Sequence, residues 1–299
     1  MKNDFLLGVL AALVFSISTQ AQVLKENPNR SFDLGVPLCA SSDRGEALTY
    51  VPADDSLWVA NDSTGTLCGI DRFTAEELQL VKRTDVFQPF QNDDGGLRSD
   101  ELELIASDGG NTLYMINNVN ISSECNPKTD IAVIYKLTRP APFGEFSIAE
   151  SHDLNPGAHE CDLAEPVFHY KAMVVIDGSI YIADDATGEI HLYDYYQQEM
   201  TTFPDSPLLT ITGNPKIVDL AYDGNFLWVL RSQSASNSRL DKYDWKTLQL
   251  LTHYDLSNLI SVFARWGGIA VAGREIYLVT NDSNVDNKIH VFTEQQITE

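Results

Sequence analysis

The feature that most constrains the fold is a hairpin pattern that recurs about every 50 residues. Its clearest copy lies at residues 217–252, where two alternating apolar stretches flank the turn Asp223-Gly224-Asn225 and two further strands follow. Alternation interrupted by Asp-Gly and Asn-rich turns is typical of antiparallel hairpins. Similar copies are found at residues 46–82, 103–149, 172–203 and 268–293.

One aromatic residue marks the second strand of each copy: Trp58, Tyr114, Tyr181, Trp228 and Tyr277. A period near 50 residues with about four strands per unit predicts a β-propeller, whose blades bury their faces against one another. We therefore predict an all-β fold, a single β-propeller of five blades. Six blades remain open, because residues 138–172 could contain a degenerate blade. A β-sandwich predicts no such repeat, and no stretch keeps the 3.6-residue period of a long helix.

The N-terminal residues 1–21 have the pattern of a signal peptide. Lys2 precedes an apolar run at 5–17, and Thr19-Gln20-Ala21 resembles a signal-peptidase site. An apolar core of about a dozen residues is too short to cross a bilayer, which needs roughly 20. We expect a secreted or periplasmic protein with no membrane insertion after signal cleavage.

The mature chain is expected to hold one domain. We predict a flexible leader at residues 22–30 and the propeller domain at residues 31–299. The fifth copy ends with little room for an outer strand, and the segment Ser31-Phe32-Asp33-Leu34 has no partner of its own. This N-terminal strand is therefore predicted to close the ring.

Four cysteines follow the signal segment: Cys39, Cys68, Cys125 and Cys161. Four cysteines in an exported chain favour two disulfides, for which three pairings are open, and their spacing matches no zinc motif. Pairing Cys125 with Cys161 would staple two long loops, and Cys39–Cys68 would then hold the closing strand.

The charge balance limits the class of partner. The net charge is −23, from 43 acidic and 20 basic residues. Such a chain repels nucleic acid and anionic membranes and disfavours a polyanionic substrate. We expect no nucleic-acid partner; a small molecule, a glycan or a protein remains.

Acidic residues begin several inner strands, which all start on one face of a propeller. Alignment of the copies places at these starts Glu46, Glu103, Ala172, Asp219 and Gly268. On the same face the second strands end at Asn61-Asp62, Asn117-Asn118, Asp184-Asp185, Arg231-Ser232 and Asn281-Asp282. We predict a Ca²⁺ or another divalent cation there, held by Glu46, Glu103, Asn117 and Asp219, because clustered carboxylates favour a cation. Alternatively, such Asp and Asn side chains satisfy the backbone of turns.

Other polar residues are predicted to surround this central mouth and bind the ligand: Arg44, Arg98, Asn61, Asp184, Lys216, Arg265 and Trp266. His169 is a candidate general base, although a lone histidine is more often structural. No Gly-x-Ser-x-Gly, His-Glu-x-x-His or Gly-rich phosphate loop is present, so we expect no organic cofactor.

The strand pairs at residues 219–230 and 268–279 resemble those of NHL-type and gluconolactonase-type propellers. Residues 56–67 and 103–118 also resemble exported bacterial propellers of the SdiA-regulated and esterase-like phytase groups, with Leu104 where those groups carry Gly. The gluconolactonase resemblance implies a divalent metal held by a Glu at the start of an inner strand. Glu46 or Glu103, with Asn117 and Asp219, match that role.

Two functions follow from these features. The first is an exported propeller that binds a small ligand, glycan or protein at its central mouth. The second is a metal-dependent hydrolase or lyase acting on a lactone, ester or sugar acid, in which the metal polarises the substrate and His169 moves a proton. The missing nucleophile motif and the acidic chain favour binding.

Overall fold

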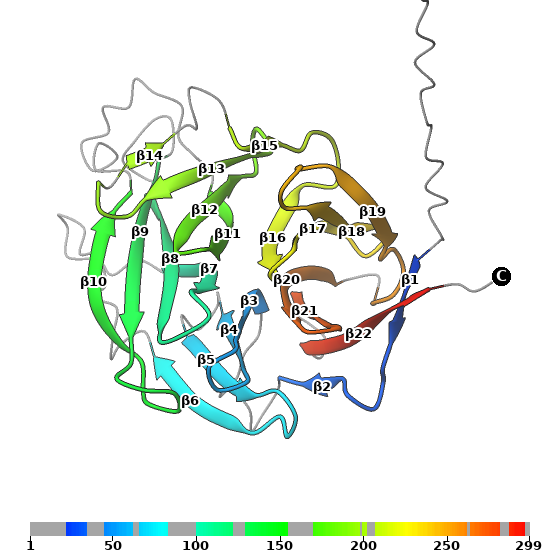
Figure 1. Cartoon of the computed structure of the whole chain (residues 1–299), viewed down its shortest axis with the longest axis horizontal. Coiled ribbons are helices and arrows are strands. Elements are labelled where there is room, and N and C mark those ends of the chain that lie inside the picture. The colour runs from blue at the N-terminus through cyan, green and yellow to red at the C-terminus, as the bar shows by residue number, and fades with distance from the viewer. Residues whose placement is uncertain are drawn as a thin grey trace, which may run out of the picture.

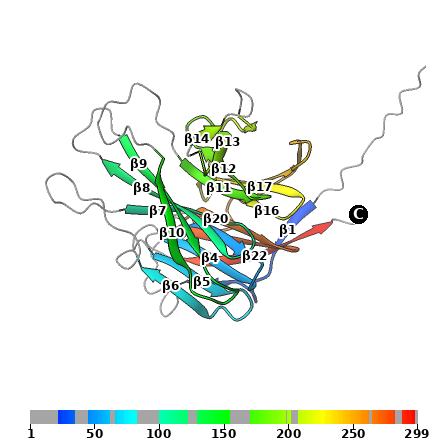
Figure 2. The same cartoon turned by 60° about the vertical axis from the view of Figure 1, so that its left-hand side comes forward.

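Five antiparallel sheets stand around a central axis (Figures 1 and 2). The computed structural model describes residues 22–34, 45–61, 66–82, 100–121, 129–154, 170–197, 199–201, 207–261, 264–281 and 287–296. Throughout these residues the chain forms strands, turns and loops, so the predicted all-β propeller of five blades is confirmed. The described part of the chain offers no helix of the length and apolar character needed to cross a membrane.

Four blades are meanders that run from the axis outward. Blade 1 consists of β3 (Gly45–Val51), β4 (Ser56–Asn61), β5 (Thr66–Asp71) and β6 (Glu77–Lys82). Blade 2 consists of β7 (Asp100–Ser107), β8 (Thr112–Ile121), β9 (Thr129–Thr138) and β10 (Ser147–Asp153). Blade 3 consists of β11 (Tyr170–Ile176), β12 (Ser179–Asp184), β13 (Glu189–Asp194) and the short outer strands β14 (Glu199–Thr201) and β15 (Leu209–Thr210). Blade 4 consists of β16 (Ile217–Tyr222), β17 (Phe226–Ser234), β18 (Asn237–Asp244) and β19 (Leu250–Asp255).

The two ends of the chain build blade 5 together. From the axis outward it consists of β20 (Arg265–Ala272), β21 (Glu275–Asn281) and β22 (Lys288–Gln296), and its outer strands are β1 (Gln22–Glu26) and β2 (Phe32–Asp33). β1 pairs antiparallel with β22 over five residues, from Gln22 opposite Gln296 to Glu26 opposite Phe292. β2 adds two further pairs at the other end of β22.

Closure by an N-terminal strand is thus confirmed, but the sequence misplaced the main closing strand. β1 lies in the segment 22–30 that was expected to be a flexible leader, whereas the expected strand at 31–34 contributes only β2. The unpaired edge of β22 explains the difference, because its backbone groups need partners. Leu24 also packs against the apolar cluster between blades 4 and 5.

The core lies between the blades. Five apolar clusters are formed, and each joins two neighbouring blades around the ring. The aromatic residues that mark the repeat all lie on second strands, and Trp58, Trp228 and Tyr277 are at most 2% exposed. Each such side chain contributes about 1.5–3 kcal/mol by burial. Gly69 faces Trp58, where a Cβ would come within 2.6 Å of the indole ring, so the blade packs around this pair.

Each inner strand carries a β-bulge near its start. In every blade the pairing with the second strand skips one residue at this point, and the skipped residues are Glu46, Glu103, Lys171, Val218 and Gly267. A bulge adds an unpaired residue and redirects its side chain. The end of the axis where the strands carry these bulges is called the bulge end below. The opposite end, where inner strands turn into second strands, is called the hairpin end.

Candidate functional site

A lysine lies between two glutamates at the bulge end. Lys171 Nζ is 3.4 Å from Glu103 Oε2 and 3.9 Å from Glu46 Oε2. Glu46 Oε1 also contacts Arg265 Nη2 at 3.2 Å and accepts a hydrogen bond from the amide of Asn281. Burial alone would lower the pKa of Lys171, but the attraction of Glu103 and Glu46 raises it above its ordinary value. Lys171 therefore stays protonated and supplies a positive charge between the two glutamates.

This arrangement bears on the predicted divalent cation. The Lys171 ammonium is already paired with both glutamates, and no three Asp, Glu, His or Cys side chains of the described residues are placed to hold a metal. Asn117 is completely buried on β8, and neither atom of its amide has a partner among the described residues. A divalent cation held by Glu46 and Glu103 would therefore have to displace Lys171. The metal stays a prediction.

Asp219 lies deeper on the axis than these glutamates. Its Oδ2 accepts hydrogen bonds from the backbone N–H of Ile269 at 2.8 Å and of Leu48 at 3.2 Å, and its Oδ1 accepts one from Leu220 at 2.9 Å. The carboxylate thus joins β16, β20 and β3. Burial raises the pKa of Asp219 well above its ordinary value, although these hydrogen bonds and the attraction of Lys171 oppose the shift.

Those of the remaining predicted binding residues that the structure describes lie at strand starts and strand ends of the bulge end. Arg44, Arg98 and His169 lie outside the described residues. Asn61 and Asp184 are buried at the ends of β4 and β12, where Asp184 accepts hydrogen bonds from Ala186 N–H and the Thr187 hydroxyl.

Two exposed basic residues and one tryptophan complete the predicted set. Lys216 pairs with Asp185 at 3.3 Å, and the Arg265 side chain is 46% exposed beside Glu46. Trp266 is fully buried and packs edge-on against His290 and Phe292, so it belongs to the core and not to a mouth.

The predicted disulfides fall largely outside the described residues. Cys39, Cys125 and Cys161 are among the residues not described. Cys68 is buried on β5 and is not a free thiol. The pairings Cys39–Cys68 and Cys125–Cys161 stay predictions.

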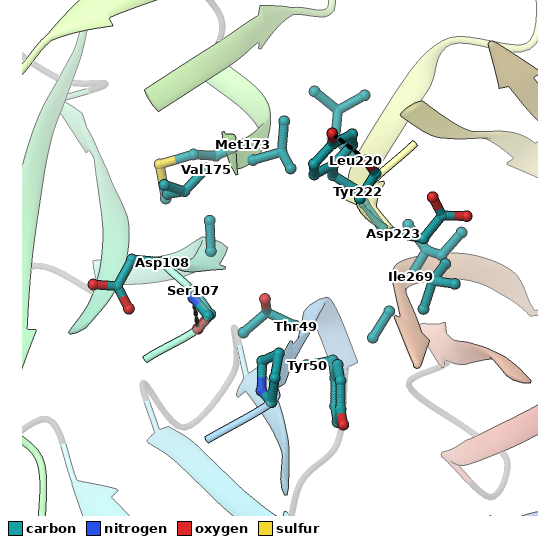
Figure 3. A pocket seen from close by; sticks show the side chains of 18 of the residues that line it. Thr49, Tyr50, Ser107, Asp108, Met173, Val175, Leu220, Tyr222, Asp223 and Ile269 are labelled. Carbon is teal, nitrogen blue, oxygen red and sulfur yellow. Dashed lines mark hydrogen bonds between the residues drawn. The ribbon is translucent and has the colours of Figure 1, made fainter. Parts of the chain in front are cut away.

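A cavity of about 420 Å³ opens at the hairpin end of the axis (Figure 3). All five inner strands line it. Its apolar wall includes Ala106, Met173, Val175, Leu220 and Ile269. Leu220 follows Asp219 in the chain, and the backbone N–H of Ile269 donates a hydrogen bond to the Asp219 carboxylate. This carboxylate therefore lies directly beneath the apolar wall.

Three aspartates stand at the rim of the cavity, each in the turn after an inner strand: Asp108, Asp177 and Asp223. The described lining residues include no Lys, Arg or His. Figure 3 shows Asp108 and Asp223 on opposite sides of the opening. The axial cavity is therefore negative at its rim and apolar within.

Two of these aspartates also shape their turns. Asp108 Oδ1 accepts the backbone N–H of Gly110 at 2.7 Å, and Asp223 Oδ2 accepts the indole N–H of Trp228 at 2.9 Å. Asp177 is exposed and forms the two-residue turn Asp177-Gly178 with φ values of 51° and 79°, the left-handed pair that a tight hairpin needs.

Two tyrosines flank the same opening (Figure 3). The Tyr50 hydroxyl donates to Asp55 Oδ1 and the Tyr222 hydroxyl donates to the carbonyl of Gly224, both at 2.7 Å. Burial and the bond to Asp55 raise the pKa of Tyr50 to about 12. Burial and the charges of Asp177 and Asp223 also raise the pKa of Tyr222. Both rings stay neutral at physiological pH.

The sequence prediction placed the site at the bulge end and missed this cavity. The available signal was the repeated Asp-Gly turn, which was used only to locate hairpins. In a propeller, these turns meet at one end of the axis, so their aspartates stand around the same opening.

Comparison with known proteins supports the fold. No protein-family model and no curated protein matches the sequence. The solved structure of glutaminyl cyclase from Myxococcus xanthus is similar with a TM-score of 0.55 at 12% identity, over 92% of this chain and 98% of that one. PQQ-bound aldose sugar dehydrogenase from Streptomyces coelicolor gives 0.48 at 13% identity, over 92% and 99%. The predicted resemblance to other propellers therefore holds at the level of fold, and the chain is a five-bladed β-propeller.

Proposed function

We propose that the protein is an exported binding protein whose axial cavity takes a small organic cation with an apolar body. The observation that carries this proposal is the chemistry of the cavity of about 420 Å³, which combines an apolar wall with three rim aspartates and no basic lining residue among those described. Ligand pockets of a few hundred Å³ commonly join apolar walls to a few polar groups that fix orientation.

Charge and aromatic character both support a cation. Burial raises the pKa of Tyr222, and the nearby charges of Asp177 and Asp223 raise it further. A neutral phenol ring attracts a cation through its face, with about 0.5–1 kcal/mol at exposed sites. The net charge of −23 adds long-range attraction for a cationic ligand.

The binding function is favoured over the metal-dependent hydrolase or lyase. A divalent cation at Glu46 and Glu103 would compete with Lys171, which already pairs with both. Glutaminyl cyclase and aldose sugar dehydrogenase share the fold, but identities of 12% and 13% do not transfer an activity. The signal peptide predicted at residues 1–21, which lie outside the described residues, supports export.

The test compares two ligands that differ in charge. Hexylamine and 1-hexanol carry the same alkyl chain, and calorimetry on the mature protein gives the affinity for each. We expect hexylamine to bind about tenfold tighter, with the preference falling as salt is raised. Equal affinities would contradict the proposal.

A variant of one rim aspartate locates the site. Asp177→Asn removes a charge and keeps the turn, because Asn-Gly suits the same left-handed pair. Hexylamine affinity should fall about twofold to fivefold, the effect of one exposed charge, while hexanol affinity stays the same. Glu145→Gln, which removes an exposed carboxylate at the outer edge of blade 2, is the control and should leave both affinities unchanged.

A further inference from the structure

A second cavity, of about 570 Å³, adjoins the axial cavity between blades 4 and 5. The two share the lining residues Asp223, Val271 and Gly273. At this boundary the hairpin turns carry glycines. A Cβ added at Gly273, which lines both cavities, would meet nothing within 4 Å, so this position leaves open space where the cavities adjoin. We call the second cavity the lateral cavity.

The wall of the lateral cavity is aromatic. Lys242 Nζ lies 4.2 Å from the ring centroid of Phe226 and 4.6 Å from that of Trp228. Both carboxylate oxygens of Glu294 hold this ammonium at 2.8 Å. Lys242 and Glu294 therefore balance each other and fix the wall, and they leave no net charge to attract a ligand.

The lateral cavity is also lined by Arg274, which is not neutralised by a carboxylate of the described residues as Lys242 is. Arg274 is exposed in the turn between β20 and β21, and it forms no ion pair with another described residue. Its guanidinium can bind a carboxylate through two hydrogen bonds. The axial cavity is thus acidic at its rim, and the cavity beside it contributes a basic group.

We propose that the ligand is an elongated zwitterion, with its ammonium group at the acidic rim of the axial cavity and its carboxylate at Arg274. This inference rests on the proposed function, because it takes the ammonium position from it. Opposite charges in adjoining cavities select a molecule that carries both, and the apolar walls contact the chain between them. A molecule with only an ammonium or only a carboxylate pairs with one of the two cavities, and a neutral molecule pairs with neither.

The experiment compares n-alkylamines with ω-amino acids of the same chain length, from roughly six to eleven carbons, lengths that fit cavities of a few hundred Å³. Above a threshold length, the ω-amino acid should bind about threefold to fivefold tighter than the matched amine, because its carboxylate then reaches Arg274. Arg274→Gln should remove this gain and leave the amine affinity unchanged. Arg274→Lys should keep part of the gain. Lys246→Gln, which removes an exposed basic residue of the turn between β18 and β19 outside both cavities, should change neither.

The outcomes separate the two proposals. If the amines bind but the ω-amino acids gain nothing at any length, the zwitterion is excluded and the cation site stands. If the gain survives Arg274→Gln, the carboxylate is bound elsewhere and the inference is wrong. If neither series binds, both proposals fall.

Discussion

The carboxylate of Asp219 links three inner strands at the axis. It is 1% exposed and accepts backbone hydrogen bonds from β16, β20 and β3. No ion pair at bonding distance compensates its burial among the described residues, and Lys171 acts on it only at longer range. Keeping this buried group charged therefore lowers the free energy of unfolding of the whole ring.

The raised pKa of Asp219 gives stability a defined dependence on pH. Between its ordinary pKa and its higher folded value, the folded chain binds more protons than the unfolded chain, so the free energy of unfolding falls as pH rises. The slope is at most about 1.4 kcal/mol per pH unit. The stability of the parent relative to Asp219→Asn should therefore decline as pH rises from about 4.

Denaturant unfolding at several pH values measures this difference. The exposed Asp177→Asn variant is the control for the loss of one carboxylate. A stability difference between parent and Asp219→Asn that stays constant over this pH range would show that Asp219 keeps an ordinary pKa.

At the scale of elements, the bulges explain what the sequence could and could not predict. Blade number and strand order follow from local alternation, turns and one aromatic per unit, and all of these are visible in the chain. The bulge is not visible, because an extra residue leaves the apolar alternation on either side intact. The sequence alignment of the inner-strand starts selected the bulge residue in two blades, Glu46 and Glu103. In the other blades it selected the residue after the bulge, such as Ala172. Lys171 was therefore overlooked.

The closing strand β1 gives a second prediction at this scale. Deleting residues 22–26 removes its pairing with β22 and the packing of Leu24. We expect the free energy of unfolding to fall by about 3–5 kcal/mol, from lost burial and lost hydrogen bonds. The bare edge of β22 should also promote self-association, which light scattering detects.

A milder substitution keeps this prediction testable if the deletion variant does not fold. Leu24→Ala retains the backbone pairing and should lower stability by about 1–2 kcal/mol. Thermal unfolding unchanged in both variants would show that β1 is not needed to close the ring.

The whole molecule carries a large excess of one charge. With 43 acidic and 20 basic residues, repulsion opposes compaction, while ion pairs such as Arg72–Glu275 act locally. Salt screens the long-range repulsion more than a partly buried pair.

Moderate salt should therefore stabilise the protein. Raising NaCl from about 10 mM to about 150 mM is expected to raise the melting temperature by a few degrees, because the Debye length shortens to about 8 Å. KCl at the same ionic strength should act equally, which separates screening from binding of a particular ion. A lower melting temperature in salt would show that ion pairs outweigh the net repulsion.

The pairing of β1 with β22 also sets an order of events during biosynthesis. Gln22 is translated well before its partner Gln296, which lies 274 positions later in the chain. Such distant partners make ring closure a late and slow step. Until then the edges of β1 and β22 that pair with each other are uncovered. We therefore expect the period before closure to be the time when this protein most depends on chaperones.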